Sequence, residues 1–311
     1  MNTSTSMGQR SDQPRSTQGR IKLPEHFYDR SDLWGLWNSL RLFGWPLLWI
    51  CLIPVLNDYS PWLAVLVILP LGVTISKTTL LIHEAVHFNL FKTRLLNVWA
   101  GRLGGWYTLV EFAAFQELHR QHHASVGKEH DPQGLDYGKL ENASQRKLAW
   151  HLLRALLGWN MVHMLVLIRQ RLKMKNKFSA VVIEFSGLFV VQGLFLMIAT
   201  KGGEHLWLGL IFPVAAATVG LFLSQLRGFC EHVPMPGENG LMRLRSHISN
   251  PIESVFIHCM NYNYHAEHHR FPRIPGRNLP ALSEWLKGQG VNIEHSPSYL
   301  ATLWARWRAC V

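Results

Sequence analysis

Four apolar segments constrain the fold of this chain more than any other feature of its sequence. Segment 178–199 contains one charged residue, Glu184, and segment 206–226 contains none. As helices rising about 1.5 Å per residue, each reaches roughly 30 Å, the thickness of the hydrocarbon layer of a membrane. Segments 42–56 and 61–76 are shorter, and the polar turn between them predicts a transmembrane hairpin. Interfacial tryptophans flank this hairpin at Trp34, Trp37 and Trp62.

The two longer segments bear on the interpretation of the shorter pair. By itself, that pair could be a buried hairpin of a soluble domain, but the second pair disfavours this alternative. We therefore expect an all-α integral membrane protein with four transmembrane helices.

Basic residues are distributed unevenly around these segments. Of the 31 Lys and Arg residues, the two short turns, 57–60 and 200–205, contain only Lys201. All the others lie outside both turns and outside the four apolar segments. Positive charge accumulates on the cytoplasmic side, so we expect both termini and the long central loop in the cytoplasm. This topology, with some attraction to anionic lipid headgroups, accounts for the net charge of +11 without a nucleic acid partner.

Three clusters of histidine lie on the predicted cytoplasmic side. Each places two or three imidazoles at i, i+3 or i+4, so on a helix each cluster points in one direction. The clusters are His83 and His87, then His119, His122 and His123, and then His265, His268 and His269. Eight imidazoles exceed the four ligands of a tetrahedral zinc and suit two metals of higher coordination number. Because no cysteine lies nearby, iron is favoured over zinc, and the sequence predicts a two-metal centre.

The first cluster has a second interpretation. His83, Glu84 and His87 also match the HExxH pattern of zinc metalloproteases, in which the glutamate is the general base. That interpretation leaves the second and third clusters unexplained, because a hydrolytic zinc site needs only one further protein ligand. A membrane zinc metalloprotease stays as a remote alternative, as does a non-catalytic metal-binding or transport protein.

Six further residues are candidates for the site. His232 follows the fourth segment as His83 follows the second, so it is either a ligand or an interfacial histidine. Asn261 lies four residues before His265 and shares its face if both are helical, where the amide could hold a metal-bound water. Ligand imidazoles usually donate their second N–H to a carboxylate or carbonyl. A carboxylate next to one cluster points away from its neighbouring histidine, so we expect it to support a histidine of another cluster. The candidate supporting carboxylates are Glu84, Asp131, Glu231 and Glu267.

The remaining histidines lack partner spacing and are interpreted as non-ligands, so His295→Ala should leave the metal content unchanged. They are His26, His130, His151, His163, His205, His247, His258 and His295. Segment 148–168 is apolar with recurring polar residues, which predicts an interfacial amphipathic helix rather than a fifth span. The four cysteines show no CxxC spacing, and we expect no disulfide.

With HxxxH, HxxHH and HxxHH in this order, the chain resembles the membrane fatty acid desaturase superfamily over about residues 34–285. The stretches 119–123, followed by His130-Asp131-Pro132, and 261–272 resemble its short bacterial branch, which includes rhizobitoxine-type desaturases. The resemblance implies four transmembrane helices with a cytosolic histidine-rich helical cap. It also implies a centre of two non-haem iron ions with O₂ as co-substrate, and a late isolated histidine ligand, here His232. No catalytic residue is expected beyond the metal ligands.

The regions outside the resemblance are expected to be a disordered basic tail, 1–33, and a C-terminal cytosolic extension, 286–311. The resemblance further implies an oxidoreductase of a bacterial inner membrane that desaturates an acyl-lipid or an acyl chain on a carrier. The alternative is a hydroxylase, ketolase or O-demethylating oxygenase of the same superfamily with a non-lipid substrate. An external electron donor such as a ferredoxin is expected, because the chain has neither a GxGxxG fingerprint nor a cysteine cluster for an iron–sulfur centre.

Overall fold

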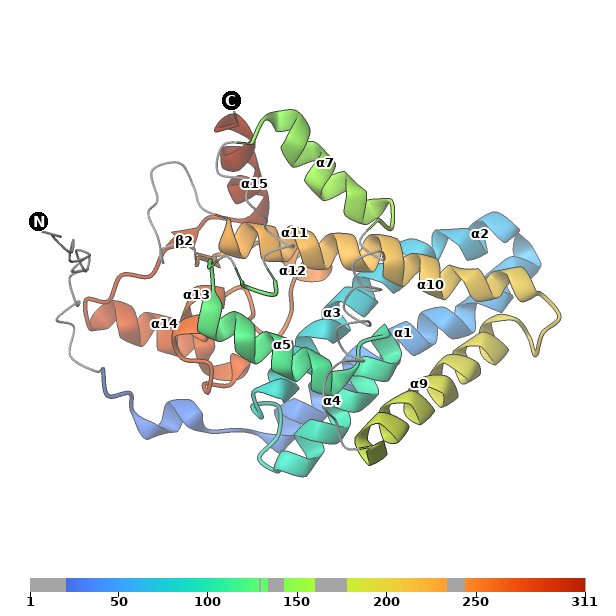
Figure 1. The fold of residues 1–311 in the computed structure, drawn as a ribbon, viewed down its shortest axis with the longest axis horizontal. Helices are drawn as coiled ribbons and strands as arrows, with labels where there is room; N and C mark the ends of the chain where they lie inside the picture. The colour runs from blue at the N-terminus through green and yellow to red at the C-terminus, as the bar shows by residue number, and fades with distance from the viewer. Residues whose placement is uncertain (1–20, 129, 134–142, 160–177, 234–243, 311) are drawn as a thin grey trace, which may run out of the picture.

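The computed structural model describes residues 21–128, 130–133, 143–159, 178–233 and 244–310 (Figure 1). Within them, four helices are long and apolar enough to cross a membrane. These helices are Glu25–Tyr59, Pro61–Val86, Val181–Ala199 and Leu206–His232. They confirm the four predicted spans, and the second and fourth run on as far as histidines of the candidate site.

The first two spans form the predicted hairpin. α1 (Asp32–Tyr59) begins after Ser31, whose side chain accepts a hydrogen bond from a backbone amide of the first turn. α2 (Pro61–Leu66) begins with a proline, which suits the first turn because its missing N–H would have no partner there. After one residue the helix continues as α3 (Ile68–Val86), which carries the chain to the first histidine cluster as predicted.

The third span, α9 (Phe178–Ala199), has the predicted bounds. Its acidic residue, Glu184, is buried, and its Oε1 lies 2.9 Å from Nε of Arg102 on α4 (Arg94–Thr108). The ion pair compensates the charge that an apolar span would otherwise have to bury alone. The ion pair of Glu184 and Arg102 therefore connects α9 to α4.

The fourth span is longer than predicted. It consists of η2 (Leu206–Leu210), α10 (Ile211–Ala215), the π-helical turn η3 (Ala216–Gly220) and α11 (Leu221–His232). It packs closely on α3 at Gly72, where a Cβ would come within 2.5 Å of the Cβ of Val219. Lys201, which follows α9, forms an ion pair with Asp58 in the last turn of α1.

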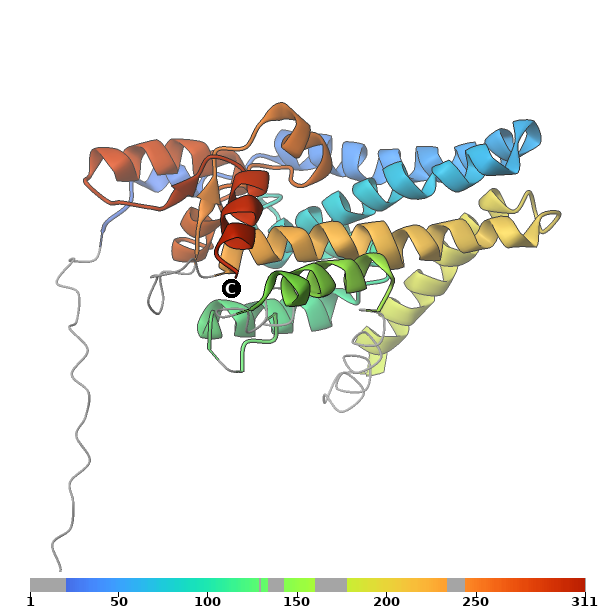
Figure 2. The same ribbon diagram turned by 90° about the horizontal axis from the view of Figure 1, so that it is seen from above.

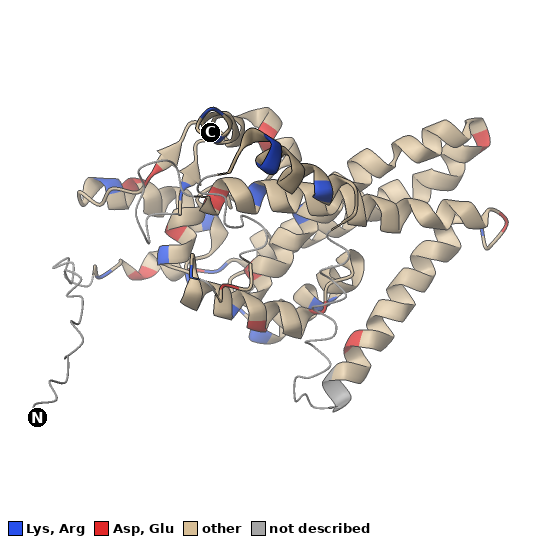
Figure 3. Cartoon of the chain, turned by 45° about the horizontal axis from the view of Figure 1, so that its top comes forward, with Lys and Arg blue, Asp and Glu red and all other residues tan. Residues whose placement is uncertain are grey.

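Most of the remaining elements gather at the end of the bundle where α3 and α11 terminate (Figures 1 and 2). They are α5 (Phe112–Ser125), α7 (Gln145–Leu156), α12 (Pro251–Phe256), α13 (His265–Arg270), η4 (Gly276–Asn278), α14 (Leu279–Gly288) and α15 (Tyr299–Arg308). Charged residues are concentrated in this part of the molecule and are sparse along the spans (Figure 3). This distribution agrees with a part that lies outside the hydrocarbon layer.

The fold is mostly helical but not purely so. β1 (Ser246–His247) and β2 (His295–Ser296) form a two-stranded parallel pair, with Ser246 opposite His295. Strands of two residues carry no alternating pattern of apolar residues, so the sequence has no signal for them. The pair joins the segment before the third histidine cluster to the segment before α15.

Two further expectations differ from the structure. The predicted tail 1–33 is too long, because η1 (Glu25–Tyr28) is helical and Phe27 is buried in an apolar cluster with residues of α14. The predicted interfacial helix 148–168 corresponds in its first part to α7, which begins three residues earlier and ends at Leu156. Residues 160–177, which contain the rest of that prediction, lie outside the described residues.

Candidate metal centre

The first histidine cluster lies at the C-terminal end of α3. His83 is buried in the last turns, and His87 is the residue that ends the helix. Phe88 then takes a left-handed φ of 57°, and its amide and the next one donate back to carbonyls of the last turn. This is a Schellman motif with phenylalanine at the position where glycine is usual. It turns the chain away immediately after His87, so both imidazoles remain at the helix end.

The second cluster lies on α5, near its C-terminal end. His119 and His123 are four residues apart and therefore share one helical face, whereas His122 points about 100° away from its neighbour. His119 and His122 are buried, and His123 is partly buried. One helix thus presents imidazoles in two directions.

The third cluster lies on α13, which begins at His265. The residues before it are not helical: Met260 and Asn261 have left-handed φ values of 58° and 63°. Asn261 donates from Nδ2 to the carbonyl of Gly276 at 3.1 Å, so the expectation that it shares a helical face with His265 is wrong. A Cβ at Gly276 would come within 2.5 Å of the Met260 carbonyl, so only glycine can pack against this turn.

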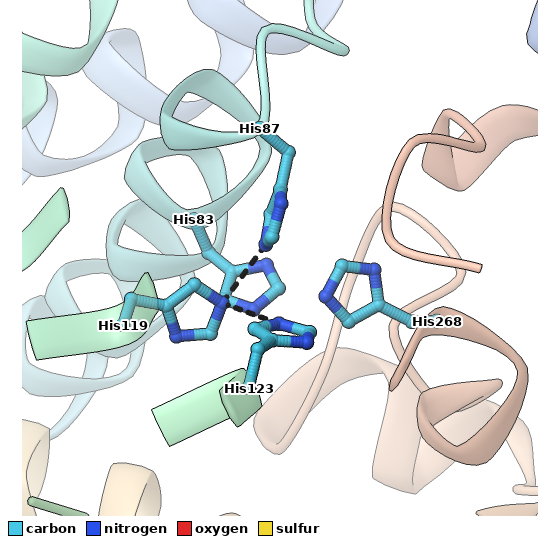
Figure 4. A group of neighbouring side chains, drawn as sticks. All are labelled: His83, His87, His119, His123 and His268. Carbon is cyan, nitrogen blue, oxygen red and sulfur yellow. Dashed lines mark hydrogen bonds between the residues drawn. The ribbon is translucent and has the colours of Figure 1, made fainter. Parts of the chain in front are cut away.

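Five imidazoles converge on one point, and we call them the five-histidine cluster (Figure 4). They belong to His83, His87, His119, His123 and His268, and their candidate ligand atoms all lie within 4.8 Å of one another. Nε2 of His119 is 2.9 Å from Nε2 of His87 and 2.9 Å from Nε2 of His123. A ring nitrogen has either one proton or one lone pair, so it cannot make both contacts as good hydrogen bonds. This convergence of nitrogens fits a bound metal ion.

The other four imidazoles form the four-histidine cluster. His122, His232 and His269, from α5, α11 and α13, form one group that could hold a metal ion, and His265 of α13 shares a second such group with His232 and Glu231. Nε2 of His232 is 3.1 Å from Nε2 of His122 and 3.2 Å from Nε2 of His265. The structure therefore brings together all nine histidines that the sequence singled out, in two groups.

The partners on the far side of two of these rings determine their tautomers. Oδ1 of Asp131 lies 2.8 Å from Nδ1 of His122, and the carbonyl of Gly228 lies 2.9 Å from Nδ1 of His232. A carboxylate and a carbonyl only accept, so each Nδ1 carries the proton and each Nε2 is left with a lone pair. Two lone pairs that face each other across 3.1 Å repel unless a cation lies between them. The residues of the four-histidine cluster thus also fit a metal ion.

Burial favours the neutral form of several histidines of the site. It lowers the pKa of His119, His268 and His269 well below the ordinary range, and neighbouring imidazoles lower it further, because a second positive charge would repel the first. Burial lowers the pKa of His87 to about 4. Neutral imidazole is the form that binds metals, so these residues can take up a metal at neutral pH without first losing protons.

Two of the four predicted supporting carboxylates contact a histidine of the site. Asp131 contacts His122, as described above. Oε2 of Glu231 lies 3.4 Å from Nδ1 of His265, so this carboxylate supports a histidine from another cluster, as predicted. Glu231 also accepts a hydrogen bond from the hydroxyl of Tyr299, a residue that the sequence analysis missed because no local pattern connects it to the site.

Glu84 contacts the site through an aromatic ring. Its two oxygens accept from the hydroxyl of Tyr262 and from the amide of Gly276, the latter at 2.8 Å. The Tyr262 ring in turn packs edge-on against His83, with centroids 4.5 Å apart. Both oxygens of this buried carboxylate are thus engaged by groups other than a hydrolytic water, which disfavours the metalloprotease interpretation. Tyr262 lies three residues before His265, and this closeness is the sequence signal that could have identified it.

Glu267 contacts a histidine outside both clusters. Its carboxylate accepts from the hydroxyl of Ser246 and lies 2.9 Å from Nε2 of His295. Burial by itself would raise the pKa of Glu267, but the hydrogen bonds from His295 and Ser246 outweigh it and lower that pKa. Glu267 therefore anchors α13 to β1 and β2 on the side away from the converging imidazoles.

The histidines interpreted as non-ligands stay outside both clusters wherever the structure describes them. Among the described residues, the groups that could hold a metal ion include none of His26, His130, His151, His205, His247, His258 and His295. His163 lies outside the described residues.

Comparison with known families places this site in context. The family model for fatty acid desaturases matches residues 60–299, which is more than half of the 311 residues and includes all nine histidines. The chain belongs to the fatty acid desaturase family. Together with the four apolar helices, membership of this desaturase family indicates an integral membrane protein and an oxidoreductase.

A curated relative agrees with this assignment over a limited stretch. The sphingolipid delta(4)-desaturase DES1 of Rattus norvegicus is 30% identical over 101 residues, which is 30% of this chain. The match spans 28% of the length of that relative. It supports a desaturase-like oxygenase without identifying a substrate.

Proposed function

We propose that the chain is an O₂-dependent non-haem di-iron desaturase that introduces a C=C bond into an acyl chain. The observation that carries the proposal is the convergence of nine imidazoles in two groups, with two Nε2 lone pairs facing each other across 3.1 Å. Each group has enough nitrogen donors for one iron ion, and the family match supports the same chemistry.

Two bound iron ions would supply the one-electron chemistry that activates O₂ and takes hydrogen from an unactivated C–H bond. Overall, a –CH₂–CH₂– unit, O₂, two electrons and two protons give –CH=CH– and two molecules of water. The protein's part is to hold neutral nitrogen donors in place and to exclude bulk water from them. His83, His119 and His122 are buried, which serves both purposes.

An acyl substrate is supported by the position of the site beside the membrane. His83 lies in the last turns of a span, and Lys77, six residues before it, donates to two carbonyls of α12 at 2.9 and 3.0 Å. α12 is thereby held beside the end of the span. Its exposed apolar side chains are Ile252, Val255 and Phe256. Such a surface fits contact with lipid tails, from which an acyl chain would reach the site.

The remaining parts of the proposal concern orientation and electrons. Following the distribution of Lys and Arg, we place both termini and the site on the cytoplasmic side of a bacterial inner membrane. The two electrons would come from an external donor such as a ferredoxin, which would dock on the basic side of the molecule. No nucleic acid partner is proposed.

Metal analysis and product analysis test this function together. The full chain, purified from an expressing host, should contain about two iron ions, and mass spectrometry of the host's lipids should show acyl chains that have lost two hydrogen atoms. The matched control is His123→Ala, which should give neither result. A gain of one oxygen atom would replace the desaturase with the hydroxylase alternative. One zinc ion and no iron would overturn the proposal.

A further inference from the structure

The first residue of α15 reaches the site from a distant part of the chain. Tyr299 is 1% exposed, and its hydroxyl donates to Oε1 of Glu231 at 3.0 Å. The other oxygen of Glu231 lies 3.4 Å from Nδ1 of His265 and 3.5 Å from Nε of Arg227. One buried carboxylate thus joins the hydroxyl of Tyr299 to a histidine of the four-histidine cluster.

The Tyr299 ring is itself held firmly. It stacks on the His247 ring with centroids 3.9 Å apart and an interplanar angle of 12°. Nε2 of His247 lies 3.1 Å from Oγ1 of Thr302, one turn further along α15. The amide after Tyr299 donates to the buried carboxylate of Glu253 on α12. β1, α12 and α15 therefore fix the ring, and the hydroxyl has a defined direction.

We propose that Tyr299 is a positioning residue for the four-histidine cluster. Its hydroxyl holds Glu231 in the orientation that keeps the proton of His265 on Nδ1, so that the Nε2 lone pair points toward the cluster. The inference rests on the proposed function in that it assigns a metal ion to this cluster. The effect of losing the Tyr299 hydroxyl should be confined to this cluster, because the five-histidine cluster has a separate support in Glu84, Tyr262 and Gly276.

Loss of the hydroxyl has a predictable consequence. Without it, Oε1 of Glu231 loses a partner in a buried environment, which is costly for a carboxylate. Arg227 lies one helical turn away and is the remaining charged partner, so the carboxylate would turn toward it and leave His265 Nδ1. The His265 ring would then lose the contact that fixes its tautomer.

The test is a metal titration of the purified full chain with Co²⁺, whose absorption spectrum reports the ligands of each bound ion. His83→Ala and His265→Ala serve as references that each remove a ligand from one cluster. In Tyr299→Phe, which keeps the stacked ring, binding at the four-histidine cluster should weaken by about 10–100-fold, the usual effect of removing a support of a metal ligand. Binding at the five-histidine cluster should be unchanged.

Two controls separate positioning from general stability. Thr302→Val removes the partner of His247 but leaves the hydroxyl of Tyr299 in place, so both metal positions should be retained. In a Glu231→Gln background, adding Tyr299→Phe should have no further effect, because Tyr299 acts through that carboxylate.

Several results would overturn the inference. They are unchanged Co²⁺ binding in Tyr299→Phe, equal loss at both clusters, additive effects of the Tyr299 and Glu231 changes, and failure of Tyr299→Phe to fold while Thr302→Val folds. Failure of the proposed function is a separate result. In that case the wild type would bind two Co²⁺ ions and Tyr299→Phe would weaken binding at the four-histidine cluster alone. The iron-loaded wild type, however, would yield no desaturated product.

Discussion

The five-histidine and four-histidine clusters contain the same kind of side chain but are assembled differently. The five-histidine cluster takes four of its five imidazoles from α3, the residue that follows it and α5, and Glu84, which reaches the cluster through Tyr262, lies between two of them in the sequence. The four-histidine cluster combines α5, α11 and α13, and one of the two carboxylates that contact it, Glu231, is held by α15. One cluster is therefore mainly a product of two helices close in sequence. The other depends on tertiary packing among four elements and should be more sensitive to distant changes.

The largest expected effect comes from two neighbouring residues that belong to different clusters. His122→Ala removes a ligand of the four-histidine cluster, and His123→Ala removes a ligand of the five-histidine cluster. Each should reduce turnover by more than about 100-fold, beyond the usual effect of losing a supporting residue. Iron analysis and spectroscopy should show that the two variants lose different ions. Full activity in His122→Ala would end the di-iron interpretation.

Acidification should destabilise the metal-free protein. The pKa of His87 is about 4 in the folded protein and near 6.5 when unfolded, so between these values the unfolded chain binds more protons. Stability is therefore lost as the pH falls from above about 6.5 through about 4, by up to about 3 kcal/mol for this residue. Thermal unfolding of the metal-free protein between neutral pH and pH of about 5 measures the loss. In His87→Ala the dependence should be shallower, and an equal slope would contradict the assignment.

Glu84 and Glu231, which lie beside different clusters, should have separable effects of intermediate size. Glu84→Gln should weaken metal binding at the five-histidine cluster, and Glu231→Gln at the four-histidine cluster, each by about 10–100-fold. Metal titration of both variants, with wild type beside them, checks this selectivity. A zinc protease would respond differently, because Glu84→Gln would then abolish turnover while the zinc stayed bound.

The smallest effect is expected from His295→Ala. His295 contacts Glu267 of the third cluster, but Ser246 still donates to that carboxylate, and neither histidine cluster includes His295. Metal content should therefore stay unchanged, with a modest loss of stability of about 1 kcal/mol. His232→Ala provides the contrast, since it should lose iron while keeping its membrane insertion. If these two variants had the same iron content, the assignment of His232 as a ligand would be wrong.

The features that could be predicted from the sequence are those that depend on neighbouring residues. The spans follow from the length of the apolar segments, and the direction of each histidine cluster follows from spacings of three and four residues. His232 could be placed only by its position after a span, and the structure brings it to within 3.1 Å of His122. These local rules sufficed to identify the nine imidazoles that converge.

The features that could not be predicted depend on turns and on distant contacts. Asn261 was expected on a helix because nothing in its sequence context signals that Met260 and Asn261 take left-handed φ values. That turn is stabilised by Gly276, from a later segment. Tyr299 is 68 residues from Glu231, and the hydrogen bond between them exists only because α11 and α15 pack together. No spacing rule connects residues that far apart.

The contact between Tyr299 and Glu231 also has a consequence for biosynthesis. Tyr299 follows His269, the last of the nine histidines, by 30 residues (299 − 269). When the third cluster has just been synthesised, the residue that contacts Glu231 has therefore still to be added and packed. Helices that fold early can present the ligands of the five-histidine cluster other than His268 well before that point. The four-histidine cluster should accordingly be the last part of the site to be completed as the protein folds.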